Sequence, residues 1–365
     1  MKRCLTYIIL LFASLILGAC HVFDDYMYGP EGEQKVKVSF VLALGSSDGS
    51  PVTRAESWDP DDPTDDGDDL GYDPKVLGDE YDNMIAANTL QVVFYTAATN
   101  AYYSRVNIES CTPIDGSVNE YLFTGSMFVE KEDMENSFKM MVIANVDQKI
   151  TPFTKLEDLT FRAESQEYIP MWGVKTLTLD ELSADNDDKQ VIYVLRSMAK
   201  IEVEVSDALN DQGYTLSGLK LNNLNTYGYV LPAGALTQDK TEDLKLYDAF
   251  NPYASAQDAY SVTSENPGSK SLVMYVPEYD NDSSPATINV SLLHNDNGVI
   301  SGISPKQAIE FRNYNGGQAT GESYDILRNH NYRFVITGIS VEGGLKYYLV
   351  RIEDLELGGR YGFEF

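Results

Sequence analysis

The clearest strand signal in this chain is Val36-Lys37-Val38-Ser39-Phe40-Val41-Leu42-Ala43-Leu44. Large apolar residues occupy every second position, and the residues between them are smaller or polar. Because successive side chains of a strand point to opposite faces, this pattern predicts a strand with one buried face. The residues on that face are Val36, Val38, Phe40, Leu42 and Leu44.

The same alternation recurs along the rest of the chain, whereas long amphipathic helical stretches are scarce. This favours an all-β fold of mostly antiparallel sheets that each bury one face. A short helix is expected near 151–159, where Thr151 can cap and Pro152 suits a first turn. Further strands are predicted at 89–98, 121–129, 138–146, 169–179, 191–205, 214–224, 271–279, 286–294, 308–311, 331–339 and 345–357.

The length of 365 residues suits two cores, at roughly 150 residues per domain. A polar loop at 183–189 interrupts the strand pattern, and we place the domain boundary there. The predicted segments are a signal at 1–19, a lipid tether with a removable strand at 20–54, an acidic mobile linker at 55–82, an amino-terminal β-sandwich at 83–187 completed by strand 36–44, and a carboxy-terminal β-sandwich at 188–365.

The first residues are typical of an export signal. Lys2 and Arg3 precede an apolar run at 5–17, which is too short to span a bilayer. The run leads into Leu17-Gly18-Ala19-Cys20, the pattern of a bacterial lipobox. We therefore expect Cys20 to be lipidated and to anchor the chain in the outer membrane; an ordinary cleaved signal peptide is the alternative.

Charge and cysteine content limit the partners. Asp and Glu number 56 against 27 Lys and Arg, for a formal net charge of -29, and such a surface repels nucleic acid and anionic lipid. Protein or glycan is the expected partner class.

The cysteines leave no disulfide for the mature chain. Cys4 lies in the signal and Cys20 is the lipid site, so Cys111 has no partner for a disulfide there.

The sequence has no local signature of catalysis or of a cofactor. His21, His294 and His330 lie far apart, without the companions that zinc sites or nucleophilic triads need. The acidic residues offer many carboxylate pairs, but no spacing singles one out. We expect a protein that is not an enzyme and uses no cofactor.

The acidic stretch loosely fits a calcium loop. Its candidate ligands are Asp62, Thr64, Asp66, Gly67 and Asp73. The closing position holds Asp73 where such loops have a bidentate glutamate, and two prolines interrupt the run. A solvated linker without metal is the favoured interpretation.

Several motifs follow one another in a specific order. They are the lipobox at Cys20, Thr53-Arg54-Ala55 after the first strand, Ile169-Pro170-Met171-Trp172-Gly173, Leu195-Arg196-Ser197-Met198-Ala199-Lys200-Ile201 and Leu327-Arg328-Asn329-His330-Asn331-Tyr332. Together they resemble the fimbrillin family, the type V pilins of anaerobic Gram-negative bacteria, over nearly the whole chain. The resemblance implies two transthyretin-like sandwiches, export as a lipoprotein, and polymerisation after an arginine-specific protease removes the amino-terminal strand.

Strand removal and replacement can be matched to particular residues. Cleavage between Arg54 and Ala55 would release strand 36–44 and leave an apolar groove with unpaired backbone groups, which another subunit could fill with a strand of its own. The candidate donor is the end of the chain, where apolar side chains again alternate at Tyr361, Phe363 and Phe365.

Two alternatives stay open. A tip or anchor subunit would keep its strand and leave Arg54 uncut. A monomeric surface lipoprotein that binds glycans or another receptor would show clustered aromatics on one face, and only two tryptophans, Trp58 and Trp172, are present. In each case we expect a cell-surface location.

Overall fold

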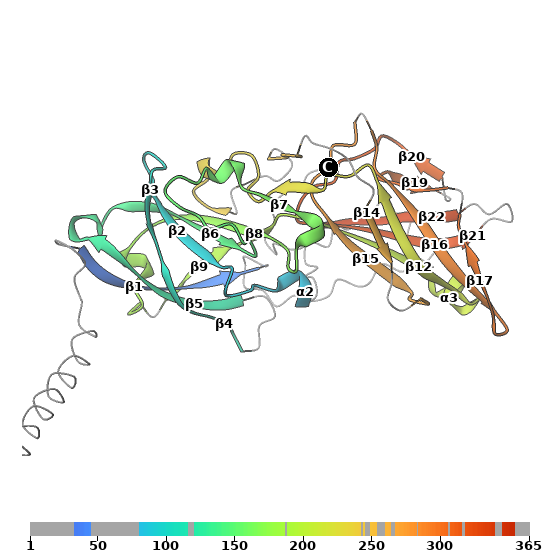
Figure 1. Ribbon diagram of the computed structural model, residues 1–365, viewed down its shortest axis with the longest axis horizontal. Coiled ribbons are helices and arrows are strands. Elements are labelled where there is room, and N and C mark those ends of the chain that lie inside the picture. The colour runs from blue at the N-terminus through green and yellow to red at the C-terminus, as the bar shows by residue number, and fades with distance from the viewer. Residues whose placement is uncertain are drawn as a thin grey trace, which may run out of the picture.

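The computed structural model describes residues 33–44, 80–115, 120–186, 188–241, 244, 249–253, 260–263, 267–282, 284–305, 307–315, 318–339 and 345–354. Over these residues the chain is mostly β-strand. It forms two β-sandwiches that lie end to end along the long axis of the molecule (Figure 1). The predicted all-β fold with two sandwiches is confirmed.

The amino-terminal sandwich pairs a four-stranded sheet of order β4-β5-β1-β9 with a five-stranded sheet of order β10-β8-β6-β2-β3. Its strands are β1 (Glu33–Ala43), β2 (Gln91–Thr96), β3 (Tyr102–Arg105), β4 (Asn107–Pro113), β5 (Glu120–Glu130), β6 (Ser137–Ala144), β8 (Met171–Thr178), β9 (Gln190–Tyr193) and β10 (Leu195–Arg196).

The carboxy-terminal sandwich pairs a sheet of order β15-β11-β21-β22 with one of order β14-β12-β16-β17, and β18 also pairs with β16. Its strands are β11 (Ala199–Val205), β12 (Tyr214–Asn222), β14 (Tyr260–Thr263), β15 (Ser271–Val276), β16 (Thr287–Asp296), β17 (Val299–Ile303), β18 (Ile309–Glu310), β21 (His330–Ile339) and β22 (Leu345–Asp354).

The remaining elements are short. Two further sheets have two strands each: β7 (Thr160–Arg162) pairs with β13 (Tyr227–Tyr229), and β19 (Asn313–Asn315) pairs with β20 (Gln318–Thr320). The helices are α2 (Glu80–Asn83), α3 (Asp207–Asp211) and the 3-10 turns η1 (Lys131–Asp133), η2 (Leu156–Asp158), η3 (Ala163–Ser165), η4 (Asp180–Leu182) and η5 (Ala235–Thr237). Within the described part of the chain, none is long and apolar enough to cross a membrane.

The helix expected at 151–159 shrinks to η2. The backbone N–H of Thr151 donates to the Thr154 hydroxyl at 2.9 Å, and this closes a separate turn before η2 begins. Local side-chain hydrogen bonds of this kind compete with helix formation.

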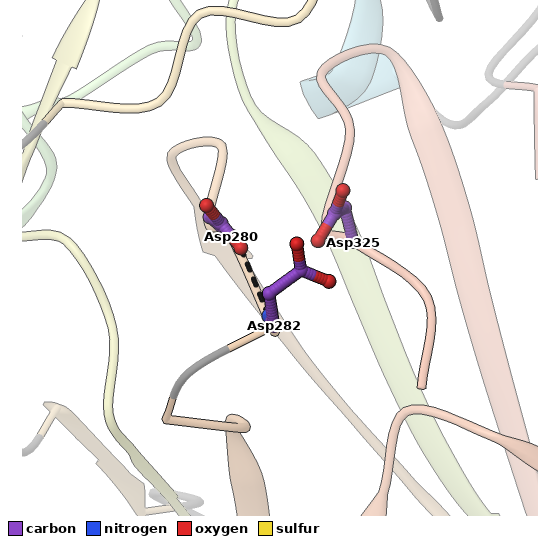
Figure 2. Close-up of side chains that lie close together, drawn as sticks. All are labelled: Asp280, Asp282 and Asp325. Atoms are coloured by element: carbon purple, nitrogen blue, oxygen red, sulfur yellow. Dashed lines mark hydrogen bonds between the residues drawn. The ribbon is translucent and has the colours of Figure 1, made fainter. Parts of the chain in front are cut away.

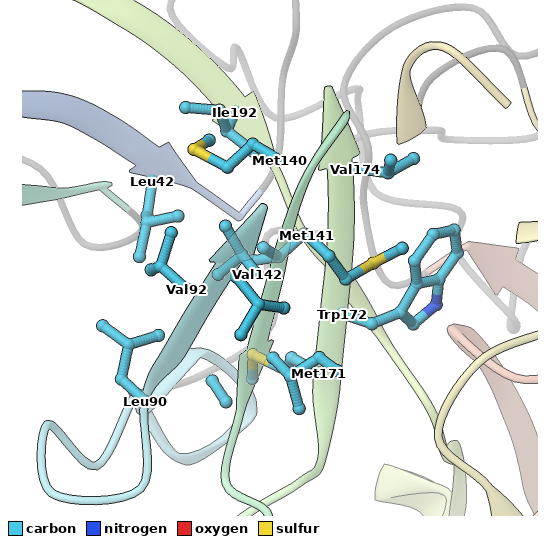
Figure 3. Close-up of a cluster of buried hydrophobic side chains, with 14 of the residues drawn as sticks. Leu42, Leu90, Val92, Met140, Met141, Val142, Met171, Trp172, Val174 and Ile192 are labelled. Carbon is cyan, nitrogen blue, oxygen red and sulfur yellow. The ribbon is translucent and has the colours of Figure 1, made fainter. Parts of the chain in front are cut away.

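Each sandwich has its own hydrophobic core. Figure 3 shows part of the amino-terminal core, in which Leu42 of β1 lies beside Val92 of the facing sheet. In the carboxy-terminal core the ring of Phe311 packs edge-on against Tyr332 and Phe334, at centroid distances of 5.5 and 5.6 Å. Two separate cores match the two-domain expectation from length.

The change from one sandwich to the other comes after β10, so the boundary that we placed at 187 is corrected. β9 pairs with β1, and β10 pairs with β8, so both belong to the amino-terminal sandwich. The predicted single strand 191–205 is in fact three strands, because the chain leaves one core after Met198 and enters the other at Ala199. Apolar and polar residues keep alternating where the chain passes from one sandwich to the other, so the sequence pattern does not reveal this passage.

A segment that follows β12 returns to the amino-terminal sandwich. β13 pairs with β7, and the hydroxyl of Thr241 accepts from the Val174 N–H at 2.7 Å and donates to the Val174 carbonyl at 3.1 Å. Lys139 Nζ donates to the carbonyl of Leu236 at 2.5 Å. The chain therefore passes between the two sandwiches more than once, and the segment after β12 ties them together.

Candidate functional site

β1 is an internal strand of the amino-terminal sandwich, although it lies far before its two neighbouring strands, β5 and β9, in the sequence. It pairs antiparallel with β5 over its whole length, from Glu33 opposite Glu130 to Ala43 opposite Glu120. On its other side it pairs parallel with β9 from Phe40 to Ala43. β1 thus has a neighbouring strand on both of its edges.

The upstream half of the β9-facing edge is covered by a loop. Val38 forms an isolated bridge with Ser183, and the Ala184 N–H donates to the Lys37 carbonyl at 3.2 Å. At the other end the Val194 N–H donates to the Ala43 carbonyl at 3.1 Å. If β1 left, backbone groups on β5, on β9 and on this loop would lose partners together.

The predicted inward face of β1 is buried. Val36 keeps 7% of its surface exposed, and Val38, Phe40, Leu42 and Leu44 keep none. The ring of Phe40 stacks on Phe123 of β5 at a centroid distance of 4.4 Å. Burying five such side chains stabilises the sandwich by on the order of 10 kcal/mol before the entropy of ordering the strand is subtracted.

Removing β1 would therefore leave an apolar slot between two sheet edges. The slot has a floor of core side chains from the facing sheet, such as Val92 in Figure 3, and walls that carry free hydrogen-bonding groups. A segment with large apolar residues at every second position satisfies both requirements.

Several predicted site residues lie outside the described residues: the lipid site Cys20, the cleavage pair Arg54 and Ala55, and the donor residues Tyr361, Phe363 and Phe365. The possible calcium ligands Asp62, Thr64, Asp66, Gly67 and Asp73 lie there too. The described chain comes nearest to the donor segment at β22, which ends at Asp354. β22 is the outer strand of its sheet and pairs with β21.

One end of the predicted acidic linker is buried and well anchored, which corrects its assignment as mobile up to residue 82. Asp82 lies in α2 and has no exposed surface. Its carboxylate accepts from Lys200 Nζ at 2.7 Å and from the Tyr275 hydroxyl at 2.6 Å, and its carbonyl accepts from Arg196 Nε at 2.7 Å. Lys200 and Tyr275 belong to the carboxy-terminal sandwich, so α2 joins the two domains.

The motifs at 195–201 and 327–332 meet at the same junction. Arg196 Nη1 donates to Asn329 Oδ1 at 3.1 Å, and its Nη2 donates to Asn83 of α2. Arg196 and Asn329 are fully buried, and Asn329 has a positive φ of 57°. Asparagine tolerates this left-handed conformation better than most residues.

A second buried ion pair joins Arg328 to Glu278. Arg328 Nη2 lies 2.7 Å from Glu278 Oε2, and Arg328 Nη1 donates to the Val230 carbonyl at 2.9 Å. Both side chains are almost completely buried. The motif at 169–173 reaches the junction as well, since the Ser197 N–H donates to the Pro170 carbonyl at 2.8 Å. The structure thus explains these three motifs as parts of one domain joint, a role that sequence reasoning did not assign.

The two described histidines have packing roles. His330 is buried, and its Nδ1 lies 2.8 Å from the Arg328 carbonyl. His294 stacks on Tyr214 at a centroid distance of 4.2 Å.

Three carboxylates from the segments that follow β15 and precede β21 come together, as Figure 2 shows. They are Asp280, Asp282 and Asp325, with one oxygen of each within 4.8 Å of the others. The Asp282 N–H donates to Asp280 Oδ1 at 2.9 Å, and the Asn281 N–H donates to Asp325 Oδ1 at 2.8 Å. Burial, followed by the charges of Asp280 and Asp282, raises the pKa of Asp325. The first of these hydrogen bonds closes the turn at 280–282, and the second ties that turn to Asp325, so the three carboxylates lie together because they hold the backbone in place.

Comparison with known proteins finds similar solved structures at low sequence identity. No family model matches the chain, and no curated protein matches it. Among solved structures, it is similar to a proposed cell adhesion protein from Parabacteroides distasonis, with 12% identity, coverage of 89% of this chain and 99% of the other, and a TM-score of 0.48.

Two further similar structures are fimbrial proteins. For the tip fimbrial protein Mfa3 from Porphyromonas gingivalis, with C-terminal truncation, the identity is 11%, the coverage 87% of this chain and 99% of the other, and the TM-score 0.46. For a fimbrial assembly protein from Parabacteroides distasonis the identity is 11%, the coverage 86% of this chain and 95% of the other, and the TM-score 0.42.

Proposed function

We propose that this protein is a structural subunit of a cell-surface fimbria that joins its neighbours by exchanging the β1 strand, and that it mediates adhesion and is not an enzyme. One observation carries the proposal: β1 fills an internal sheet position, while the only chain that attaches it downstream to the sandwich is the segment 45–79, which contains Arg54. A single cut in that segment would convert an internal strand into a separate peptide held only by non-covalent contacts.

The order of events is the one that the resemblance to the type V pilins implies. Export and lipidation at Cys20 would bring the closed subunit to the outer membrane, with β1 protecting the slot from premature pairing. An arginine-specific protease would then cut between Arg54 and Ala55. A neighbouring subunit would insert its carboxy-terminal residues, with Tyr361, Phe363 and Phe365 in the pockets that β1 vacated.

The domain joint around Asp82 supports this sequence. Because α2 is fixed between the two sandwiches by Lys200, Tyr275 and Arg196, the new amino end would stay attached to the subunit when β1 leaves. The release would then concern the strand alone, and the rest of the chain would keep its core contacts.

The test uses the chain from residue 21 onward, treated with an arginine-specific protease. We expect mass spectrometry to find cleavage after Arg54 and electron microscopy to find filaments. Arg54→Gln is the matched control and should stay uncut and monomeric. A cut chain that stays monomeric and does not bind a peptide of residues 355–365 would refute strand exchange. An uncut chain would point instead to a tip or anchor subunit that retains its strand.

A further inference from the structure

The hairpin of β16 and β17 lies at the end of the carboxy-terminal sandwich that is far from the amino-terminal one (Figure 1). Its two-residue turn is Asn297-Gly298, and both residues have a positive φ, of 52° and 90°, as a type I′ hairpin turn requires. The Gly298 N–H donates to Asn295 Oδ1 at 2.8 Å, and the Asn295 N–H donates to the Gly213 carbonyl at 2.9 Å. Hydrogen bonds thus fix both the turn and its attachment to the sandwich.

β17 is an outer strand that exposes apolar side chains. Within the described residues it pairs with β16 alone. Its sequence, Val299-Ile300-Ser301-Gly302-Ile303, carries no charge, and Val299 and Ile300 keep 70% and 66% of their surface exposed. Exposed apolar side chains on a strand edge favour pairing with another strand.

The outer strand β4 shows how an edge is normally protected against such pairing. It has a β-bulge opposite β5, an exposed charge at Glu109, and Pro113 at its end. Bulges, charges and prolines are the usual means of keeping a sheet edge from pairing. β17 has none of the three, so its edge is suited to accept a partner strand.

The outward backbone groups of β17 come from alternate residues. Asp296 and Val299 face each other across the two-residue turn, and the closing pair of such a hairpin exchanges backbone hydrogen bonds. Because this pattern repeats every second residue, Ser301 also turns its N–H and C=O groups toward β16. An added strand would therefore meet the N–H and C=O groups of Ile300 and Gly302.

A second copy of β17 fits this edge in one register. When two such strands lie antiparallel and overlap over their full length, Ser301 faces its own copy and Ile300 faces Gly302. The residues that face each other are then those with outward backbone groups, so each Ile300–Gly302 pair can exchange hydrogen bonds. A Cβ at Gly302 would have nothing within 4 Å, so there is open space for the Ile300 side chain of the other copy.

The lack of charge on β17 determines which partner suits it. Two copies of a chain with a net charge of -29 repel each other, so they can pair only through a surface without charge. β17 provides such a surface, and Val299 of one copy would pack beside Ile303 of the other. A charged peptide would find no opposite charge on this strand.

We infer that two copies of this protein pair through β17, antiparallel and centred on Ser301, so that the sheets of two carboxy-terminal sandwiches become continuous. A strand of this length buries much less than the roughly 1,200 Å² of a stable interface, so a single contact is weak. Contacts repeated along two filaments would add up through their effective concentration, and would join the proposed fimbriae side by side. The pairing itself does not depend on strand exchange.

The experiment places a cysteine at the centre of the pairing. It uses the uncut chain from residue 21 with Cys111→Ser, which leaves an introduced cysteine as the only thiol. In the paired strands the two Cα atoms at position 301 would lie about 4.5 Å apart, within the range that a disulfide spans. Under mild oxidation, Ser301→Cys should form a linked dimer at least about tenfold faster than Ser291→Cys, an exposed position on the neighbouring strand β16. Mass spectrometry of the linked peptide identifies the bond.

A charge at the interface should break the pairing. Ile300→Lys, added to the Ser301→Cys chain, would place two ammonium groups in the contact and should slow dimer formation at least about tenfold. Phe128→Lys makes the same charge change at an exposed apolar residue of the other sandwich and should leave the rate unchanged. In the unsubstituted chain, added salt should strengthen self-association in analytical ultracentrifugation, because it screens the repulsion between copies.

Four results would overturn the inference. Equal rates for Ser301→Cys and Ser291→Cys would exclude the register, and equal rates for Ile300→Lys and Phe128→Lys, with both variants folded by circular dichroism, would exclude β17 as the contact. Association that weakens with salt would show a contact held by charge. Inhibition by a peptide of residues 355–365 would make the end of the chain the occupant of β17 in place of a second copy. Since the chain is uncut throughout, a failure of cleavage or of filament growth would leave these results unchanged.

Discussion

The side-chain nitrogen of Lys200, on β11, lies 2.7 Å from the carboxylate of Asp82, on α2, and the contact is almost completely shut off from solvent. Across 118 positions in the sequence it connects the first element described after β1 to the opposite sandwich. A buried pair of this kind stabilises little compared with an apolar replacement, but breaking it leaves one charge without a partner.

Asp82→Asn should therefore lower the free energy of unfolding by about 3–5 kcal/mol, because Lys200 would remain buried and uncompensated. Urea denaturation followed by tryptophan fluorescence measures the change. Asp207→Asn is the matched control: its ion pair with Lys270 is exposed, and it should leave the midpoint unchanged. An Asp82 variant as stable as the Asp207 variant would contradict a structural role for the joint.

Leu42→Ala should lower the free energy of unfolding by about 2–5 kcal/mol, since it creates a cavity in a fully buried part of β1. Val41 on the opposite face is partly exposed, and Val41→Ala should have a much smaller effect. In protease-cut protein, Leu42→Ala should also speed the dissociation of the β1 peptide, which size-exclusion chromatography with mass spectrometry would detect. Equal effects from the two substitutions would contradict the observed orientation of β1.

Gly173→Ala should destabilise the amino-terminal sandwich by about 1–3 kcal/mol. A Cβ at this position would collide with the carbonyl of Tyr193, a backbone atom that cannot rotate away. Gly302, on the outer strand β17, has open space around the corresponding position, so Gly302→Ala is a strand-matched control without a clash. Thermal unfolding of the two variants would separate the effect of the clash at Gly173 from the low propensity of alanine for β-strands.

Stability should fall between about pH 10 and pH 12. Burial raises the pKa of Tyr95 and of Tyr103 to about 12 from an ordinary value of 10.0, and in Tyr103 the hydrogen bond to Asp133 adds to the shift. In that pH window the unfolded chain has lost these protons while the folded chain retains them, so rising pH favours unfolding. Replacing both tyrosines with phenylalanine should flatten the slope of stability against pH, measured by urea denaturation. An unchanged slope would assign the alkaline sensitivity to other groups.

Sequence patterns predicted those parts of the fold that depend on one-sided burial. The five inward residues from Val36 to Leu44, on β1 and just after it, were found because each second position there is a buried apolar residue. β3 and β4 were missed, since their residues are half-exposed and show little contrast between faces. The outer strands of a sheet give weak patterns for this reason.

The domain joint could not be predicted from local patterns. Asp82 looks like the end of an acidic linker until Lys200 and Tyr275, which are remote in sequence, are placed against it. Arg196 and Asn329 lie in motifs that the sequence analysis singled out only for their resemblance to a family, and Arg196 was placed inside the predicted strand 191–205. Buried polar residues are visible in a sequence only when their partners are known.

The two neighbours of β1 run in opposite directions, β9 parallel to it and β5 antiparallel. A replacement that preserves both hydrogen-bond ladders must therefore enter with the same heading as the strand it displaces. If the carboxy-terminal segment of a neighbour supplies that strand, as proposed, successive subunits would all face one way and form an open, directional filament with chemically different ends. Because the two ends would expose different surfaces, adding a subunit at one end and capping the other would require different interactions.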